Sequence, residues 1–311
     1  MKSYKNRIFL FLALFLCVQL LEVHSQKGST DTPDFRATLQ KKLEDYEKVA
    51  TKNGQQVKTK GVELAEICSV DTDVVARRVF AEYGAIFVAE DVTFPQRCIF
   101  RNEQEVLAYQ NSASPKTETL DGTTITLQEE AMEDFLDARK EAAKLNLKIS
   151  PRGGSIAARR SYADTQRLWD SRFFSGLKHW VGKRKISRQE AELVRNLPTQ
   201  QQVAKVLEWE NRGWFFSTDF SKSILYSVAA PGASQHLFML ALDVEQFANP
   251  TVREILARHG WFQTVQSDLP HFTYLGMKES ELPEKGLKPV FFSGQKFWIP
   301  NLPPQTVRKN S

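Results

Sequence analysis

The sequence predicts an α+β fold: an antiparallel sheet with flanking helices, preceded by an N-terminal extension. Apolar residues recur every three or four positions over most of 127–210, which is typical of amphipathic helices. Short apolar runs with strand character follow at 268–276 and 290–300. Long helices followed by paired strands indicate the α+β class rather than alternating α/β units.

The first 25 residues have the layout of a secretory signal peptide. Basic residues come first, an apolar run covers 8–16, and small or polar residues follow as far as Ser25. The run is short for a membrane span, although an uncleaved anchor stays an alternative. We therefore expect cleavage after Ser25, no stable membrane span afterwards, and a secreted or periplasmic protein.

The chain beyond this segment divides into four parts. They are a helical or flexible segment at 26–60, a small mixed subdomain with a disulfide at 61–120, the main domain at 121–302 and a flexible tail at 303–311. In the first part, apolar spacing predicts a helix over 35–49 that Asn53-Gly54 ends. In the second part we expect a strand at 85–88 and a short helix at 102–110.

The main domain is predicted to begin with a long amphipathic helix. Thr126 and Glu129 fit a capping box at its start, and apolar residues then recur as far as Leu145. A later helix has Asn249 as its cap and Gly260 as its stop signal. The remaining helices are expected at 159–173 and at 189–210 with an interruption at Pro198, and the strands at 147–150, 234–244, 268–276 and 290–300.

Charge and cysteine content narrow the class of protein. A formal net charge of +5 over 311 residues is mild, so the composition does not indicate a nucleic-acid-binding protein. The basic segment 182–188 is more typical of a solvated helix end. Two cysteines follow the signal segment, Cys68 and Cys98. In an oxidising compartment such a pair favours one disulfide, and zinc ligation stays the alternative.

Two of the expected strands carry side chains that bind metals. His236 and Asp243 lie in an otherwise apolar run, and Asp268 and His271 lie in the next. Two imidazoles and one carboxylate suit a single zinc ion with one position left open. Asp268 is placed to transfer a proton beside such a site. The alternatives are a strand-end aspartate that faces water, a turn aspartate and ordinary buried histidines.

Three motifs follow one another between residues 155 and 276. The first has the form S-x-H-x-x-G-x-A-x-D, the second E-x-W-H and the third, which comes earliest in the chain, is like Y-R-S-Y-x-x-Q. The matching residues are Ser234, His236, Ala241 and Asp243 in the first, Asp268 and His271 in the second, and Arg160, Ser161, Tyr162 and Gln166 in the third. In these motifs the chain resembles the VanX/VanY-type zinc D-Ala-D-Ala carboxypeptidases and dipeptidases, which belong to the hedgehog/DD-peptidase superfamily.

The chain departs from the family pattern at three positions. Met239 replaces a glycine, which implies a different shape for the loop after His236. Pro270 replaces the tryptophan, and Asp268 replaces the glutamate. The shorter side chain of Asp268 must come closer to the reacting water, which concerns catalytic power more than metal binding.

The resemblance implies a hedgehog/DD-peptidase-like fold and a set of roles. One Zn²⁺ would be held by His236, Asp243 and His271, and Asp268 would act as general base and then as general acid. The other expected roles are oxyanion or carboxylate binding by Arg160 and substrate contact by Ser234, Tyr162 and Gln166. For the last two, packing of the turn and helix is an equal alternative.

The implied function is that of a secreted zinc metallopeptidase. Its substrates would be peptidoglycan stem peptides that contain D-alanine, cut in the manner of a D-alanyl-D-alanine carboxypeptidase. The alternative, suggested by the aspartate at position 268, is a non-catalytic, zinc-stabilised module that binds peptidoglycan or another envelope partner. The sequence leaves the oligomeric state open.

Overall fold

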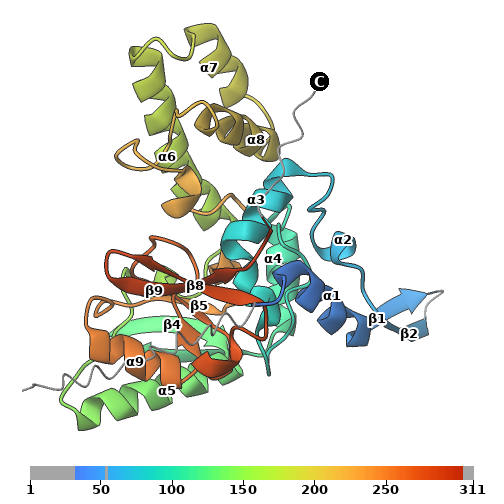
Figure 1. Cartoon of the computed structure of the whole chain (residues 1–311), viewed down its shortest axis with the longest axis vertical. Helices are drawn as coiled ribbons and strands as arrows, with labels where there is room; N and C mark the ends of the chain where they lie inside the picture. Colours follow the sequence, from blue (N-terminus) through green and yellow to red (C-terminus); the bar gives the residue numbers. More distant parts are fainter. Residues whose placement is uncertain (1–31, 53–54, 304–311) are drawn as a thin grey trace, which may run out of the picture. The chain divides into compact units, whose positions relative to one another are not determined.

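Helices and short antiparallel strands build the described part of the chain, which is residues 32–52 and 55–303 of the computed structural model (Figure 1). The α+β class that the sequence predicts is confirmed. The expected signal peptide at 1–25 lies outside the described residues, as does all of the expected tail except residue 303. No described helix is long and apolar enough to cross a bilayer.

The α-helices begin where their sequences carry start signals. In most of them a side chain before the first turn accepts a hydrogen bond from the free backbone N–H groups there, namely Asp34, Asp73, Asn102, Ser161, Ser187 and Asn249. The helices are α1 (Phe35–Asp45), α2 (Leu64–Ile67), α3 (Val74–Tyr83), α4 (Glu103–Ser112), α5 (Glu129–Lys144), α6 (Tyr162–Gly182), α7 (Arg188–Arg195), α8 (Thr199–Glu210) and α9 (Pro250–Arg258).

The strands pair antiparallel throughout the described residues. Three hairpins are formed by β1 (Glu47–Lys52) with β2 (Gln55–Lys60), β3 (Pro115–Leu120) with β4 (Thr123–Gln128), and β8 (Leu287–Phe292) with β9 (Gln295–Pro300). A three-stranded sheet has the order β5 (Ala241–Asp243), β7 (His271–Tyr274), β6 (Trp261–Phe262). Short 3-10 helices are η1 (Gly84–Val88), η2 (Gly154–Ala157), η3 (Ile224–Tyr226), η4 (Gln235–Phe238) and η5 (Glu279–Glu281).

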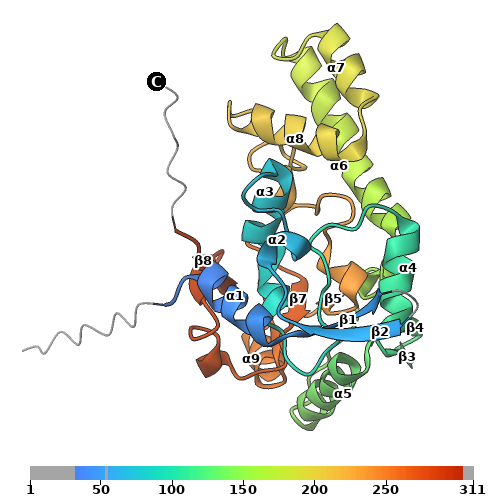
Figure 2. The same ribbon diagram turned by 90° about the vertical axis from the view of Figure 1, so that its right-hand side faces the viewer.

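The two faces of the central strand β7 have different surroundings, one polar and the other aromatic. Successive side chains of a strand point to opposite sides, so His271 and Thr273 share one face and both reach Gln235 of η4. Tyr274 lies on the other face and packs against Trp261. Helices α5 and α9 lie side by side near the sheet in Figures 1 and 2. The polar face of β7 is therefore left for the candidate site.

Helices α6, α7 and α8 form a separate layer that extends away from the sheet (Figure 2). Their packing rests on aromatic residues that are removed from water, because Trp169, Phe173 and Trp209 are each 0% exposed. Phe216, which follows α8, stacks on Phe173 and Trp209. These rings pack the middle of α6 against α8 and the segment after it, while the far end of α6 leads into α7.

Cys68 and Cys98 are joined by a disulfide whose Cα atoms lie 5.3 Å apart, as expected from the sequence. The bond fixes the segment after α2 to the loop that precedes α4. Buried residues of this region share one core with those of the main domain. The division at residues 60 and 120 stays a prediction.

Several element predictions were wrong near turns. Helix α1 ends at Asp45 and the chain continues into the β1–β2 hairpin, because Asn-Gly between two extended runs is also a hairpin signal. Thr126 does not cap a helix but lies in β4 opposite Thr117, since Asp121-Gly122 makes another hairpin. Local patterns of this kind fit either structure until a partner strand is known.

Three predicted strands also differ in the structure. Residues 85–88 belong to the 3-10 helix η1. The run 147–150 is no strand, and the chain there makes one isolated bridge, from Pro151 to Val244. The segment 234–244 forms η4 before it becomes the short strand β5. Apolar runs this short predict burial better than they predict backbone conformation.

Candidate metal centre

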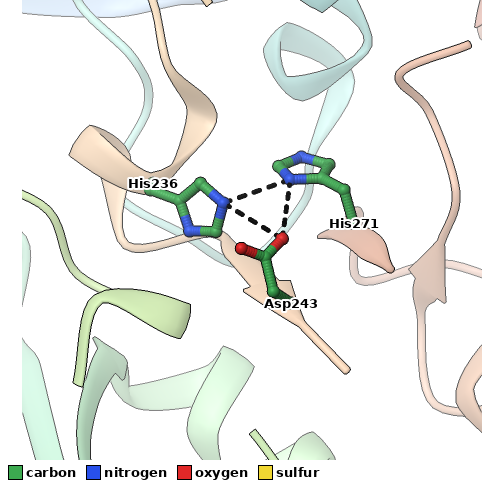
Figure 3. A group of neighbouring side chains, drawn as sticks. All are labelled: His236, Asp243 and His271. Carbon is green, nitrogen blue, oxygen red and sulfur yellow. Dashed lines mark hydrogen bonds and ion pairs between the residues drawn. The ribbon is translucent and has the colours of Figure 1, made fainter. Parts of the chain in front are cut away.

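The side chains of His236, Asp243 and His271 converge on one point (Figure 3). Nε2 of His236 lies 3.1 Å from Nδ1 of His271. Oδ1 of Asp243 lies 3.5 Å from the first nitrogen and 3.4 Å from the second. Both histidines are buried, at 1% and 4% exposure. The structure therefore brings together the three residues that the sequence singles out as metal ligands.

Backbone geometry explains how distant segments deliver these groups. Asp243 and His271 are direct cross-strand partners in the β5–β7 pair. His236 lies in η4, which ends at Met239 with φ 56° and ψ 31°. This left-handed conformation is one that glycine adopts readily and other residues rarely do. Met239 thus makes the sharp turn that carries the chain from His236 into β5.

The hydrogen-bond partner of His236 fixes where its proton lies. Nδ1 is 2.8 Å from the carbonyl oxygen of Ala158, and a carbonyl can only accept, so Nδ1 donates. Nε2 therefore presents a lone pair to the centre. Burial, and after it the Arg160 guanidinium, lowers the pKa of His236 to about 4. The ring is neutral near neutral pH, as a metal ligand must be.

His271 is oriented by the amide of Gln235. The Gln235 amide nitrogen donates to the carbonyl oxygen of Tyr83 over 2.9 Å, which directs its oxygen Oε1 to the opposite side. That oxygen lies 2.8 Å from Nε2 of His271 and 2.5 Å from the hydroxyl of Thr273. Nε2 of His271 is then the donor, and its Nδ1 also presents a lone pair to the centre.

Three lone-pair atoms thus face one another with no proton between them. Ligands held at zinc distances of about 2.0–2.1 Å in a tetrahedron are separated by about 3.3–3.4 Å. The observed separations of 3.1, 3.4 and 3.5 Å agree with that spacing. Atoms of this kind repel one another unless a cation lies among them. Donor type, protonation and spacing therefore all fit a zinc ion.

Arg160 holds the carboxylate in this arrangement. Its Nη2 donates to Oδ2 of Asp243 over 2.6 Å, and its Nε donates to the carbonyl oxygen of Ile156 over 2.9 Å. Burial alone would raise the pKa of Asp243, but the positive charge of the adjacent Arg160 guanidinium holds it below the usual range. Asp243 is consequently ionised, with one oxygen for Arg160 and the other for the centre.

The three groups open onto a cavity of about 170 Å³. It is lined by Tyr83, Arg160, Thr165, Leu168, Arg172, Ser227, Val228, Ala229, Ser234, His236, Asp243, Asp268 and His271. Asp268 keeps partial exposure, yet removal of its carboxyl from water raises its pKa to about 6. Three of the expected substrate and catalytic residues, Arg160, Ser234 and Asp268, therefore share the cavity with the metal-binding group.

Tyr162 and Gln166 are not among the residues that line this cavity. The side chain of Gln166 donates to Asp170 and accepts from Thr199, so it joins α6 to α8. Tyr162 is half-buried at the first position of α6. Their contact with a substrate stays a prediction.

Sequence reasoning missed Gln235, Tyr83 and Arg172. Gln235 had one local signal, because it is an amide next to a candidate ligand in an apolar run. Arg172 had none: it is one of many arginines, and only the fold turns it towards the cavity. Its Nε donates to the hydroxyl of Ser227 over 3.2 Å and its Nη1 to the hydroxyl of Ser171 over 3.1 Å. No described carboxylate pairs with it.

Comparison with known proteins finds similarity to solved structures. No family model matches the chain, and no curated protein matches it in sequence. Among solved structures, a variant of the vancomycin-resistance D,D-pentapeptidase VanY from the VanB-type cassette with Zn(II) is similar over 52% of this chain and 79% of its own, with 17% identity and a TM-score of 0.30. VanYB in complex with D-alanine-D-alanine is similar over 55% and 83%, with 16% identity and a TM-score of 0.33.

A third solved structure is that of the LdcB LD-carboxypeptidase. It is similar over 51% of this chain and 64% of its own, with 15% identity and a TM-score of 0.30. Each of these similarities extends over about half of this chain.

Proposed function

We propose that this chain is a zinc-dependent peptidase that removes D-alanine from peptidoglycan stem peptides outside the cytoplasm. One observation carries the metal part of the proposal. The lone pairs of His236 and His271 and an oxygen of Asp243 meet at 3.1–3.5 Å, while their protons and remaining oxygen are bound elsewhere. The substrate class rests on the motif resemblance around these residues.

His236, Asp243 and His271 would hold a single zinc ion. When bound, such an ion supplies Lewis acidity, which polarises a carbonyl and makes water a stronger acid. The chain itself fixes the three ligands: Ala158 and Gln235 set the tautomers of the two histidines, and Arg160 sets the rotation of the carboxylate. Loss of a supporting group of this kind typically lowers metal affinity or activity about 10–100-fold.

Asp268 is the residue we assign to proton transfer. The other carboxylate of the cavity, Asp243, is occupied by Arg160 and the centre, whereas Asp268 lines the cavity without a hydrogen-bonded cation. Asp268 would accept a proton from the attacking water and return it to the leaving amine. A pKa of about 6 in the ion-free chain is suited to that exchange.

Arg172 supports a carboxypeptidase rather than an endopeptidase. It is a guanidinium at the cavity wall whose partners are two neutral hydroxyls, those of Ser171 and Ser227. A peptide that ends in the cavity would bring a carboxylate, which pairs well with such a guanidinium. Ser234, which lines the cavity, would hydrogen-bond the peptide backbone. Arg160 would add positive charge near the developing oxyanion while it holds Asp243.

The disulfide supports a place outside the cytoplasm, because such bonds persist in oxidising compartments. Together with the expected signal peptide, it favours a secreted or periplasmic protein. Peptidoglycan is then an accessible partner.

Metal content and peptide digestion test the proposal together. The purified chain should contain about one zinc per chain and should release D-alanine from muropeptides, read by mass spectrometry. Asp268→Asn should keep the zinc and lose hydrolysis by about 100-fold or more, whereas Asp137→Asn on the exposed side of α5 should change neither. A chain without zinc affinity would refute the metal site, and an unaltered rate in Asp268→Asn would refute the role of Asp268.

The alternative is a non-catalytic, zinc-stabilised module that binds peptidoglycan or another envelope partner. The short side chain of Asp268 favours it. Under this alternative the unaltered chain, fully loaded with zinc, would bind muropeptides without cutting them.

A further inference from the structure

A second surface with a distinct chemical character lies on helices α6 and α7, away from the candidate metal centre. A groove of about 580 Å³ runs between the two helices. Its apolar floor is formed by Phe174, Leu177, Val181 and Ala191. Phe174 is 39% exposed, which is high for a phenylalanine. We call this groove and the basic residues around it the α6–α7 face.

Basic residues surround the apolar floor. Lys178, Arg188 and Arg195 line the groove together with one carboxylate, Glu192. Arg195 also lies over the ring of Phe174 at 5.0 Å. Lys183, Arg184 and Lys185 are exposed in the turn that joins α6 to α7. Cations at the end of α6 are favoured by the helix dipole, but that effect ends within one turn and does not account for cations along the groove.

Most of these cations have no anionic partner. The acidic residues nearby on α7 and α8 are engaged by other groups, because Glu190 and Glu208 pair with Lys205, and Glu208 also pairs with Arg212. Glu192 pairs with Arg195. Within residues 55–303 no carboxylate forms an ion pair with the remaining five, which are Lys178, Lys183, Arg184, Lys185 and Arg188.

We propose that the α6–α7 face docks on an anionic lipid surface. Five unneutralised cations beside an apolar groove with an exposed phenylalanine, Phe174, resemble the pattern of proteins that lie at a bilayer interface. In Figures 1 and 2, α7 lies at the end of the helical layer farthest from the sheet, so a flat surface can reach it. An acidic peptide seated in the groove would leave the three cations of the turn unused, whereas an extended anionic surface engages them as well.

Vesicle co-sedimentation tests the proposal. The chain from Gln26 onward is used, because it keeps every described residue and the whole core without the apolar N-terminal run. It should sediment with vesicles made of equal parts phosphatidylglycerol and phosphatidylcholine, and should remain in solution with phosphatidylcholine alone. Binding should weaken as salt rises.

Substitutions locate the binding surface. Each cation near such a membrane strengthens binding about fivefold, so the triple variant Lys183→Gln, Arg184→Gln, Lys185→Gln should bind about 100-fold more weakly. Phe174→Ser should weaken it further through the apolar strip. A matched control removes the same charge from cations that are already paired, Lys116, Lys140 and Lys148, and should lose much less.

Two results would overturn the proposal. Equal losses in the turn variant and the matched control would show that binding follows net charge alone. Binding to soluble polyglutamate without binding to phosphatidylglycerol vesicles would assign the face to an acidic peptide instead. The metal content and peptidase activity of the turn variant should equal those of the unaltered chain, because the α6–α7 face shares no residue with the cavity.

Discussion

Replacement of Gln235 by leucine tests whether the protonation pattern derived for the metal centre is correct. The side chain of Gln235 is 0% exposed, and Gln235 is not itself one of the metal ligands. It acts through His271, whose Nε2 donates to its amide oxygen over 2.8 Å. Leucine has a similar volume but accepts no hydrogen bond. In Gln235→Leu the proton of His271 can therefore move to Nδ1, the nitrogen that faces the centre.

The expected loss has two separate parts. Loss of a group that orients a metal-bound histidine weakens metal affinity about 10–100-fold, or about 1.4–2.7 kcal/mol. The variant also leaves the carbonyl of Tyr83 without the donor that reaches it over 2.9 Å. An unpaired buried polar group costs about 1–3 kcal/mol of folding free energy whether or not zinc is present. The ion-free chain should thus be less stable, and zinc should restore less stability than it does in the unaltered chain.

Zinc affinity is measured by competition with a chromogenic chelator, and the free energy of unfolding is measured by urea denaturation with and without zinc. Gln202→Leu is the matched control. Gln202 is also buried, at 8% exposure, and donates to the carbonyl oxygens of Arg195 and Leu197 in the remote helical layer. That variant should lose stability but keep its zinc affinity. Gln235→Glu retains an acceptor for His271 and should keep zinc affinity while it loses the bond to Tyr83.

One result would refute the reasoning. If folded Gln235→Leu binds zinc as tightly as the unaltered chain, the tautomer of His271 is not set by Gln235. The lone-pair argument for the centre would then fail for this ligand.

Three further predictions address the cavity, the disulfide and the pH dependence. Arg172→Met should lower kcat/KM about 10–100-fold for peptides with a free terminal carboxylate, since a charged hydrogen bond is worth about 1.5–3 kcal/mol; equal losses on amidated peptides would contradict carboxylate binding. Replacement of Cys68 and Cys98 by serine should lower the free energy of unfolding by about 3–4 kcal/mol for a separation of 30 residues, read by urea denaturation, and an unchanged midpoint would show that the bond adds no stability. In the zinc-free chain, burial lowers the pKa of His236 to about 4, so the unfolded state binds more protons and stability falls as the pH drops from 6.5 towards 4. Burial raises the pKa of Asp268 to about 6, so here the folded state binds more protons and this residue adds stability as the pH falls from 6 to 3.8. Asp268→Asn removes that gain and should increase the acid-induced loss of folding free energy by on the order of 2 kcal/mol between pH 6.5 and 4.5. A smaller loss in the variant than in the unaltered chain would contradict the raised pKa.

The sequence predicted the identity of the metal-binding residues better than it predicted the elements that hold them. Histidine and aspartate in apolar runs drew attention to His236, Asp243 and His271, and the motif resemblance implied that they are the ligands. The backbone around them was less certain, because a short apolar run fits a strand or a 3-10 helix equally well. Thus 234–244 was expected as one strand, whereas the turn at Met239 divides it into η4 and β5.

Hairpins were missed for a related reason. Asn53-Gly54 and Asp121-Gly122 mark a reversal of the chain, but a reversal after a helix and one between strands use the same residues. Which of them forms is decided by whether a second extended segment pairs with the first. That depends on hydrogen bonds between residues far enough apart that no local pattern contains both.

By itself, the sequence predicted the α+β class from the spacing of apolar residues and favoured a disulfide from the two cysteines after the signal segment. The candidate ligands followed from residue type together with the motif resemblance. Only the tertiary structure decided that Ala158 and Gln235 set the tautomers of the histidines, that Arg160 holds Asp243, and that Arg172 lines the cavity while Gln166 does not. The hydrogen bonds from Ala158, Gln235 and Arg160 to the ligands join residues that lie 36 to 83 positions apart. Their geometry follows from packing of the whole core, and no short stretch of the chain specifies it.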